Sequence, residues 1–459
     1  MSVSISSQRS GNPIQLTDLI EAKPIGRFHL KVIALCFLII FLDGFDTTLI
    51  GFIAPALVLD WHIDRHALGP VVSAALLGIA LGSFAAGPIA DRYGRKVVLV
   101  GGVLLFAVMT LATPFAADLY WMSVLRLLTG LGLGATIPNA CTLASEYAPH
   151  KHRAAIVTTV LCGFTIGSAA GGFASSWVLR YWGWQGVLFT CGGAALLLVP
   201  LLMAQMPESL HFLIKKGNSA TRIRSILGRF APEVATQQIK SDSYQFALSS
   251  NPVAAIISTT YRLSTIALWC AFFMASFAVY ILIGWLPMLV TDAGFNVADA
   301  AMTAGVFQTG GAIGVILQGR AMDRWNAHCV LAGAYIGSAL LIFLLGGAGS
   351  HLILLMAYAG LAGFCIAGAN SGIFALAAMS YPTAMRATGI SWMSGVGRFG
   401  AILSGFVGAQ LLGSGWNLLQ VTGMLTVPIV IPAVSILVKW KVSHKSRIQG
   451  TRTGLHQDA

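Results

Sequence analysis

Charged side chains are scarce in this sequence. Only 10% of its 459 residues are Asp, Glu, Lys or Arg, whereas a typical soluble domain has about 25%. With 56% hydrophobic residues and a mean hydropathy of +0.78, the chain cannot cover a water-exposed surface with polar groups. The composition therefore excludes an ordinary soluble protein and indicates a membrane protein.

The motifs of enzymes and pumps are also missing. The sequence has no G-x-x-x-x-G-K-[ST] loop, no H-E-x-x-H, no G-x-S-x-G and no paired histidines for a metal. Its seven cysteines are odd in number and never form C-x-x-C, so we expect no disulfide framework and no metal site. Residues 1–30 lack the apolar core and cleavage site of a signal peptide, and we expect none. These absences disfavour a membrane-bound enzyme and an ATP-driven pump, and we expect no cofactor.

Long apolar runs, by contrast, are abundant. A helix needs about 20 residues to cross the ~30 Å of bilayer hydrocarbon, and many segments have that length. The 51 glycines fit packed membrane helices, because small residues let such helices approach closely. We predict an all-α membrane protein with twelve transmembrane helices at residues 31–59, 66–90, 97–116, 119–145, 153–178, 184–206, 263–291, 299–321, 328–348, 351–379, 387–413 and 416–440.

The basic residues predict the orientation. Only Arg65 and Arg180 fall in odd-numbered loops, and only Arg126 and Arg398 lie inside spans away from their ends. The others lie at the termini and in or beside the even-numbered loops, so the positive-inside rule places both termini in the cytoplasm. The net charge of +12 is thus a topology signal, and we expect no nucleic-acid partner. The segment KWKVSHKSR (439–447) could also contact anionic lipid of the bilayer.

The two halves of the sequence repeat at an offset of 232–233 residues. The segment GPIADRYGRK (87–96) corresponds to GRAMDRWNAH (319–328), which aligns Asp91 with Asp323. Four other pairs share the offset: Gly51 and Gly284, Pro55 and Pro287, Arg153 and Arg386, and Trp184 and Trp416. Both halves begin on the same side, so they are parallel repeats, as in many secondary carriers.

This repeat defines the expected organisation. We predict an N-terminal tail (1–30), a six-helix bundle (31–206), a polar linker (207–262), a second six-helix bundle (263–440) and a C-terminal tail (441–459), with tails and linker cytoplasmic. In carriers of this kind the substrate binds between the halves near the midplane, and rocking of the halves alternates access.

Four charges inside the spans have no counterpart in the other half. Asp43 and Asp46 are three residues apart and share one helix face, and Asp43 lies about a dozen residues into its span, near mid-bilayer. A charge there costs about 2.5–3.5 kcal/mol, so we expect both acids to carry the coupling proton; the alternative is a static pair with an arginine. No histidine lies mid-span, which leaves no histidine relay. The four charges and their aligned residues are Asp43 with Ser276, Asp46 with Val279, Arg126 with Tyr358, and Arg398 with Thr165.

Several segments resemble one family. GPIADRYGRK matches the loop motif G-x-x-x-D-R-x-G-R-K of the major facilitator superfamily, and RLLTGLGLGA (126–135) resembles its fourth-helix motif. Within it, LDGFDTTLIGFIAPAL (42–57), with D-G-x-D, resembles the aromatic acid:proton symporters. RATGISWMSGVGRFGAIL (386–403) and LLGSGWNLLQV (411–421) are similar to the members that carry 4-hydroxybenzoate or protocatechuate.

This resemblance implies the major facilitator fold and proton-coupled uptake of an aromatic carboxylate across the bacterial inner membrane. It also implies that the protein works as a monomer in the lipid bilayer, with the aromatic carboxylate and protons as its partners. The alternative on the same fold is an efflux antiporter for aromatic acids or drugs. Charge clusters at the helix ends, which suit a gate, disfavour a passive channel.

Candidate substrate ligands follow from that expectation. Arg126 and Arg398 are fixed cations, and either could bind a carboxylate through a two-point fork. Arg126 could instead serve Asp43 or Asp46, and Arg398 could form a salt bridge or gate. The ring-contacting candidates are Phe164, Tyr280, Phe307 and Trp392, and the candidates for bonding a ring hydroxyl are Asn139, Gln308 and Asn370; packing is the alternative role of each.

A set of charged residues marks the cytoplasmic helix ends. We expect them to form ion pairs and helix-terminus contacts that latch the outward-open state, the alternative being topology determination alone. The second-half segment DRWNAH lacks the glycine and the basic pair of the first, so its gating role should be weaker. The residues are Asp91, Arg92, Arg95, Lys96, Glu146, Arg153, Asp323, Arg324 and Arg386.

Overall fold

The computed structural model describes residues 14–15, 25–149, 152–216, 223, 225–226, 228, 239–240, 256–259, 261–348, 351–381 and 383–454. Helices dominate this part of the chain. A two-residue strand β1 (Ile14–Gln15) pairs in parallel with β2 (Ile239–Lys240). This short pair, which joins the N-terminal tail to the linker, is a small departure from the predicted all-α fold.

The N-terminal half is a bundle of long helices that runs up to Gln205. Its last helix breaks at Gly183, whose φ of 64° is a conformation that side-chain-bearing residues rarely adopt. The predicted loop at 179–183 is therefore reduced to a break, and the helix forms two spans. The elements are α2 (Arg27–Trp61), η1 (Arg65–Leu68), α3 (Gly69–Tyr93), α4 (Arg95–Ala112), η2 (Thr113–Phe115), α5 (Leu119–Glu146) and α6 (Arg153–Gln205).

The C-terminal half is a second bundle. The short helix α7 (Leu210–Lys215) lies in the predicted linker. The last helix continues to Gly454, beyond the predicted boundary at 440. The long helices are α10 (Arg262–Asp292), α11 (Val297–Arg324), α12 (Ala327–Gly346), α13 (Leu352–Ser380), α14 (Thr383–Gly413) and α15 (Leu418–Gly454).

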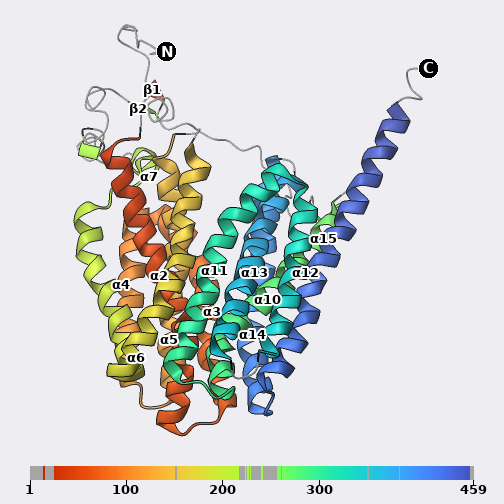
Figure 1. Cartoon of the computed structure of the whole chain (residues 1–459). Helices are drawn as coiled ribbons and strands as arrows, with labels where there is room; N and C mark the ends of the chain where they lie inside the picture. The colour runs from red at the N-terminus through yellow and green to blue at the C-terminus, as the bar shows by residue number, and fades with distance from the viewer. Residues whose placement is uncertain are drawn as a thin grey trace.

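Eleven helical segments in the described part of the chain are long and apolar enough to cross a membrane. Because α6 is broken at Gly183, they provide the twelve spans that the sequence predicts. Hydrocarbon offers no partner for backbone N–H and C=O groups, so spans of this composition form helices that satisfy these groups internally. The two bundles stand side by side, and the start of α2 and the end of α15 lie at the same end (Figure 1). We call this end the tail side and the opposite end the loop side.

Polar side chains fix where several helices begin. Asp118, Asn296 and Asn326 each accept a hydrogen bond from a backbone N–H group of the first turn of α5, α11 and α12, respectively. Such caps satisfy donors that have no partner within the helix. The loops between most spans are short, so consecutive helices run antiparallel, and the most extensive packing joins α2 to α6, α3 to α5 and α11 to α13.

The glycine of the D-G-x-D motif has a packing role. A Cβ atom at Gly44 would overlap the backbone oxygen of Phe164 on α6. The Ser168 hydroxyl donates to the Gly44 carbonyl oxygen at 2.8 Å. The helices α2 and α6 thus approach closely at this turn, which fixes the direction in which the flanking carboxylates point.

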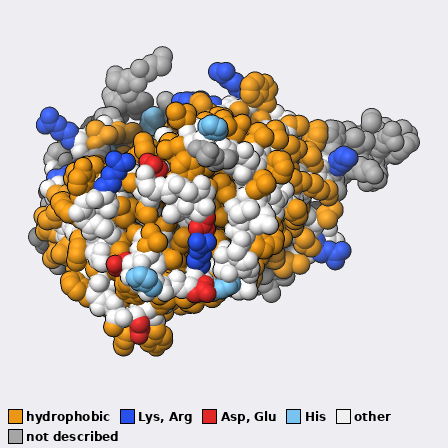
Figure 2. Space-filling view, turned by 60° about the horizontal axis from the view of Figure 1, so that its bottom comes forward, with side chains coloured by type: hydrophobic (Ala, Val, Ile, Leu, Met, Phe, Trp, Pro, Cys, Tyr) orange, Lys and Arg blue, Asp and Glu red, His pale blue; other side chains and the backbone are white. Residues whose placement is uncertain are grey.

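The two halves meet on the loop side. Helix α2 lies against α10, α3 against α14, and α6 against α11. The Ser73 hydroxyl on α3 donates to the Ile402 carbonyl oxygen on α14 at 3.1 Å, and a Cβ at Gly51 would overlap the backbone of α10 at Ile283. Figure 2, which brings the loop side forward, shows acidic, basic and histidine side chains gathered over the middle of this face.

Candidate transport site

The carboxylates of α2 lie inside the N-terminal half. Asp43 is 1% exposed and Asp46 is 2% exposed. They are one turn apart, as the i, i+3 spacing predicts, but they have different partners.

Asp46 is bound to an arginine. The Arg126 guanidinium on α5 lies 3.3 Å from Oδ2 and 3.5 Å from Oδ1 of Asp46. The Thr110 hydroxyl on α4 donates to Asp46 Oδ1 at 2.8 Å. Both ions are almost completely buried, and each neutralises the charge of the other.

Threonines complete the surroundings of Arg126. Its Nη2 donates to the hydroxyls of Thr110 at 3.0 Å and Thr129 at 3.4 Å. A third hydroxyl, that of Thr113, lies 3.5 Å away, while the buried Nε has no hydrogen-bond partner. The arginine is thus held by α2, α4 and α5 within one half, away from the surface between the halves.

Asp43 is bound by neutral groups. The Thr136 hydroxyl on α5 donates to Asp43 Oδ2 at 2.8 Å, and the Thr47 hydroxyl donates to Oδ1 at 3.2 Å. The half-buried Arg398 on α14 and Tyr280 on α10 lie within electrostatic range of this carboxylate. Asp43 therefore faces a cation of the opposite half without a salt bridge to it among the described residues.

The other candidate substrate ligands are spread over several helices. Phe307 and Gln308 on α11 are 2% and 6% exposed, and Phe307 belongs to the core shared by both halves. Asn139 is buried and donates from its amide to the Ala135 carbonyl oxygen of its own helix at 2.8 Å. Half-buried Phe164 packs against the core of the N-terminal half.

Two further candidates differ in their surroundings. The buried Oδ1 of Asn370 on α13 has no hydrogen-bond partner, so it is available to a bound molecule. Trp392 on α14 is 45% exposed and stacks on Trp269, with ring centroids 5.9 Å apart. Neither residue is placed by these contacts beside Arg398, and their roles stay predictions.

The predicted gate is partly assembled within the N-terminal half. Arg95 forms an ion pair with Glu146. The residues Asp91, Arg92, Asp323, Arg324 and Arg386 are exposed, and Arg153 is half-buried with an unpartnered Nε. Among the described residues, no ion pair or side-chain hydrogen bond joins the two halves on the tail side.

Glu208 is a member of this cluster that the sequence analysis missed. Its Oε1 accepts from the backbone N–H groups of Arg95 at 2.8 Å and Lys96 at 3.0 Å, which caps α4. The turn before α4 needs Gly94, whose φ is 99°, and a Cβ there would overlap the Glu208 carboxylate. The final G-R-K of the loop motif thus forms a helix start that receives this carboxylate.

Two ion pairs join the halves on the loop side. Arg65 Nη1 lies 2.7 Å from Asp292 Oδ2, and Arg180 Nη2 lies 3.9 Å from Asp299 Oδ1. These are the two basic residues that depart from the positive-inside pattern. Their position explains the departure, because each pairs with an acid of the opposite half.

The Arg65–Asp292 pair gives a testable prediction. Arg65→Asp places two acids together and should lower uptake several-fold, since it opposes closure of the loop side. The exchange variant, Arg65→Asp with Asp292→Arg, should restore most of the activity. Because the pair is partly exposed, we expect it to stabilise the closed loop side by only about 0.2–1 kcal/mol. Initial rates of uptake check this, and an exchange variant no better than the single variants would contradict a direct pairing role.

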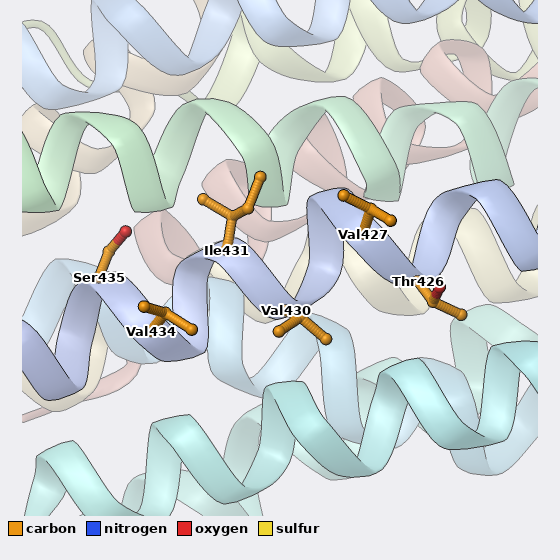
Figure 3. Close-up of a pocket in the computed structure, with 6 residues that line it drawn as sticks. All are labelled: Thr426, Val427, Val430, Ile431, Val434 and Ser435. Atoms are coloured by element: carbon orange, nitrogen blue, oxygen red, sulfur yellow. The ribbon is translucent and has the colours of Figure 1, made fainter.

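A groove on the outside of the C-terminal half is unrelated to this site. All six lining residues come from α15, and most are apolar (Figure 3). They are Thr426, Val427, Val430, Ile431, Val434 and Ser435. Among the described residues, no group of three or more His, Cys, Asp or Glu side chains could hold a metal ion.

Two bundles of membrane-length helices meet on the loop side and enclose the buried charges of Asp43, Asp46 and Arg126. This arrangement is typical of a membrane transporter. A model of the Major Facilitator Superfamily matches residues 36–348 and 268–457. The 4-hydroxybenzoate transporter PcaK of Pseudomonas putida is 44% identical over 95% of this chain and 97% of its own length. The gallate transporter of the same species is 41% identical over 93% of this chain and 95% of its own length. The chain therefore belongs to the major facilitator superfamily, and it is a transporter and not an enzyme.

Solved structures show the same fold at low sequence identity. A D-xylose-proton symporter has a TM-score of 0.70 at 15% identity, covering 90% of this chain and 97% of its own. The xylose transporter XylE from E. coli, in a partially occluded inward open conformation, has a TM-score of 0.71 at 15% identity, covering 91% and 98%. The predicted major facilitator fold is thus confirmed.

Proposed function

We propose that this protein takes up an aromatic carboxylate, such as 4-hydroxybenzoate or protocatechuate, together with protons across the bacterial inner membrane by alternating access. The names of the relatives support the substrate class, since they are transporters of 4-hydroxybenzoate and gallate. The termini and the linker face the cytoplasm, as the distribution of basic residues indicates. The transporter works as a monomer.

One observation carries the coupling mechanism: Asp43 has no salt bridge to any residue that the structure describes, and it lies within electrostatic range of Arg398. The Asp46–Arg126 pair is neutral as a unit. Of the four charges inside the spans, Asp43 and Arg398 therefore remain without a partner of this kind. A substrate carboxylate bound to Arg398 would add a negative charge near Asp43. Protonation of Asp43 removes that repulsion, so proton and anion favour each other's binding.

The tail-side charges act in the opposite phase of the cycle. With the halves joined on the loop side by Arg65–Asp292 and Arg180–Asp299, the site opens toward the tail side. When the loop side opens, the predicted gate residues of the two halves come together. The Arg95–Glu146–Glu208 cluster then serves as a rigid base for that contact, because it stays within the N-terminal half.

Arg398 is the proposed ligand of the substrate carboxylate. In Arg398→Lys, affinity should fall nearly as far as in Arg398→Ala, because an ammonium cannot reproduce a planar two-point contact. A hydrogen bond to a charged group is worth about 1.5–3 kcal/mol, which corresponds to roughly ten- to hundredfold in affinity. Binding of 4-hydroxybenzoate to the purified variants measures this loss. Unchanged affinity in Arg398→Ala would assign the carboxylate to another group.

The proposed function is tested by uptake of labelled benzoate, 4-hydroxybenzoate, protocatechuate and gallate into cells that carry this protein. We expect accumulation of at least one hydroxybenzoate, abolished by a protonophore. Accumulation that increases when the protonophore is added would indicate the efflux antiporter. No transport of any of the four acids would exclude the substrate class.

A further inference from the structure

Each carboxylate of α2 is bound by a threonine of another helix, and the two threonines have different partners. The Thr110 hydroxyl donates to Asp46 Oδ1 at 2.8 Å and accepts from Arg126 Nη2 at 3.0 Å. A guanidinium group can only donate, so the single hydrogen of this hydroxyl stays on Asp46. The surroundings of Asp46 therefore suit the charged form of its carboxylate.

The hydrogen of Thr136 has two possible acceptors. The hydroxyl oxygen lies 2.8 Å from Asp43 Oδ2 and 2.6 Å from the carbonyl oxygen of Leu133, three residues earlier on α5. A hydroxyl has one hydrogen to donate and lone pairs with which it can accept. Thr136 is completely buried, so bulk water does not compete for these bonds. The hydrogen can therefore turn from one acceptor to the other.

The charged form of Asp43 fixes one of these two arrangements. An ionised carboxylate can only accept, and a hydrogen bond to a charged oxygen is stronger than one to a neutral carbonyl. The Thr136 hydrogen then lies on Asp43 Oδ2. The Leu133 carbonyl keeps a donor, because it lies inside α5, where the backbone N–H group four residues further on donates to it.

The neutral form of Asp43 suits the other arrangement. A proton on Oδ2 turns the carboxyl group into a donor, and the Thr136 hydroxyl oxygen is its acceptor. The Thr136 hydrogen then turns to the Leu133 carbonyl, which already lies within hydrogen-bond distance. Thr47 offers no such exchange: its hydroxyl lies 3.2 Å from Asp43 Oδ1 and has no second acceptor among the described residues.

Other ionisable groups surround Asp43 without a hydrogen bond to it among the described residues. They are Asp46 on its own helix, Cys191 on α6, Tyr280 on α10 and Arg398 on α14. These groups set the electrostatic potential at the carboxylate, whereas the threonines hold its orientation. A change of the threonine hydroxyl leaves all four in place, so its effect can be separated from theirs.

We propose that Thr136 is the positioning residue of the coupling carboxylate: it holds Oδ2 of Asp43 as the oxygen that carries the proton, and it forms a hydrogen bond with Asp43 in both the charged and the neutral form. Thr136 keeps its own hydrogen throughout. Asp43 therefore gains one proton on loading and releases one on unloading, and no heavy atom has to move. The inference rests on the proposed function, because it deepens the role that Asp43 has there.

Net uptake by the full-length protein in proteoliposomes gives the first test. Thr136→Val replaces the hydroxyl with a methyl group of similar size that can neither donate nor accept. We expect uptake of 4-hydroxybenzoate to fall about tenfold, the effect of one hydrogen bond to a charged group. Thr136→Ser retains a hydroxyl and should keep most of the uptake. The matched control is Thr142→Val on the same helix, because the Thr142 hydroxyl donates to the Pro138 carbonyl oxygen; its uptake should be unchanged.

Infrared difference spectra between acidic and alkaline pH give a readout that a merely structural role would not move. The C=O stretching band of protonated Asp43 is the band that disappears in Asp43→Asn. We expect this band to move to higher frequency in Thr136→Val, because the acid O–H group loses its acceptor. It should keep its position in Thr136→Ser and Thr142→Val. If Thr136→Val does not fold, Thr136→Ala carries the test, and the same change is expected.

An unmoved Asp43 band in the variant without the hydroxyl would overturn the proposal, even if uptake fell. So would an equal loss of uptake in Thr136→Ser or in Thr142→Val. Absence of the band from the unaltered protein would show that Asp43 does not titrate, and it would overturn both this inference and the coupling role of Asp43. Failure of the proposed substrate class is a different result: the unaltered protein would transport none of the aromatic acids, while the band and its response to Thr136→Val would still be measured.

Discussion

In Asp43→Asn, concentrative uptake of 4-hydroxybenzoate is expected to fall to the level of cells without the transporter, while exchange of internal for external substrate continues. Asparagine has nearly the volume of aspartate and resembles its protonated form in carrying no charge. It therefore supports the loaded states of the cycle but cannot release a proton. Net uptake needs that release, whereas exchange passes only between loaded states.

Uptake and exchange are both measured in proteoliposomes loaded with unlabelled substrate or left empty. Asp43→Glu is the matched control, because it retains an ionisable group and should keep some net uptake. Undiminished, protonophore-sensitive accumulation by Asp43→Asn would remove Asp43 from the coupling step. Loss of exchange together with uptake would place its role in substrate binding or folding.

The second large effect is expected on stability, at Asp46. In Asp46→Asn the Arg126 guanidinium stays buried without its counter-ion, and breaking a buried ion pair in this way costs about 3–5 kcal/mol. We expect less protein in the membrane and a clearly lower unfolding temperature in detergent. Asp43→Asn lies one turn away, and among the described residues its side chain accepts hydrogen bonds from threonines alone. It is the control and should change the unfolding temperature much less.

A double-mutant cycle separates the pair from its members. Replacing both ions, in Asp46→Asn with Arg126→Gln, should recover part of the stability lost in Asp46→Asn, because no uncompensated charge remains. Equal unfolding temperatures for Asp46→Asn and Asp43→Asn would contradict a structural role of the Asp46–Arg126 pair. So would a double variant less stable than the sum of the single changes predicts.

The fold could be predicted because the length of the apolar segments and the positions of the basic residues can be read directly from the sequence. Twelve apolar runs of membrane length predict twelve helices, and the structure departs from them only in details such as the single-residue break at Gly183. The offset between the halves also predicts that Gly51 and Gly284 are equivalent, and the structure brings α2 and α10 into contact at these residues.

The candidate site could be predicted less completely from the sequence than the fold. Asp43 and Asp46 are equivalent in sequence terms, since both are carboxylates on one face of one helix. Their different surroundings come from Thr110 and Arg126 on one side and Thr136 on the other, all on helices far along the chain. Threonines are common in membrane helices and carry no charge, so a search for charged residues passes over them.

The ion pairs between the halves also could not be predicted from the sequence. Arg65 and Arg180 stood out as exceptions to the charge pattern, yet nothing in the sequence indicates which acids they meet. Their partners, Asp292 and Asp299, flank the turn between α10 and α11. Pairing across the halves depends on how the two bundles are packed, and the local sequence does not contain that information.

The energetics of the proposed uptake would make coupling necessary. An aromatic carboxylate is an anion at neutral pH, and a negative cell interior opposes its entry by about 2.3 kcal/mol per charge per 100 mV. A carrier of the anion alone would leak substrate outward. One proton per monoanion makes the cycle electroneutral, and uptake should rise as the external pH falls from neutral toward mildly acidic.

The most direct test is uptake of 4-hydroxybenzoate by proteoliposomes with the pH gradient and the membrane potential imposed separately. We predict accumulation when only an inwardly directed proton gradient is present, with a further contribution from a negative-inside potential only if more than one proton accompanies each anion. Accumulation driven by a sodium gradient without a proton gradient would contradict the account.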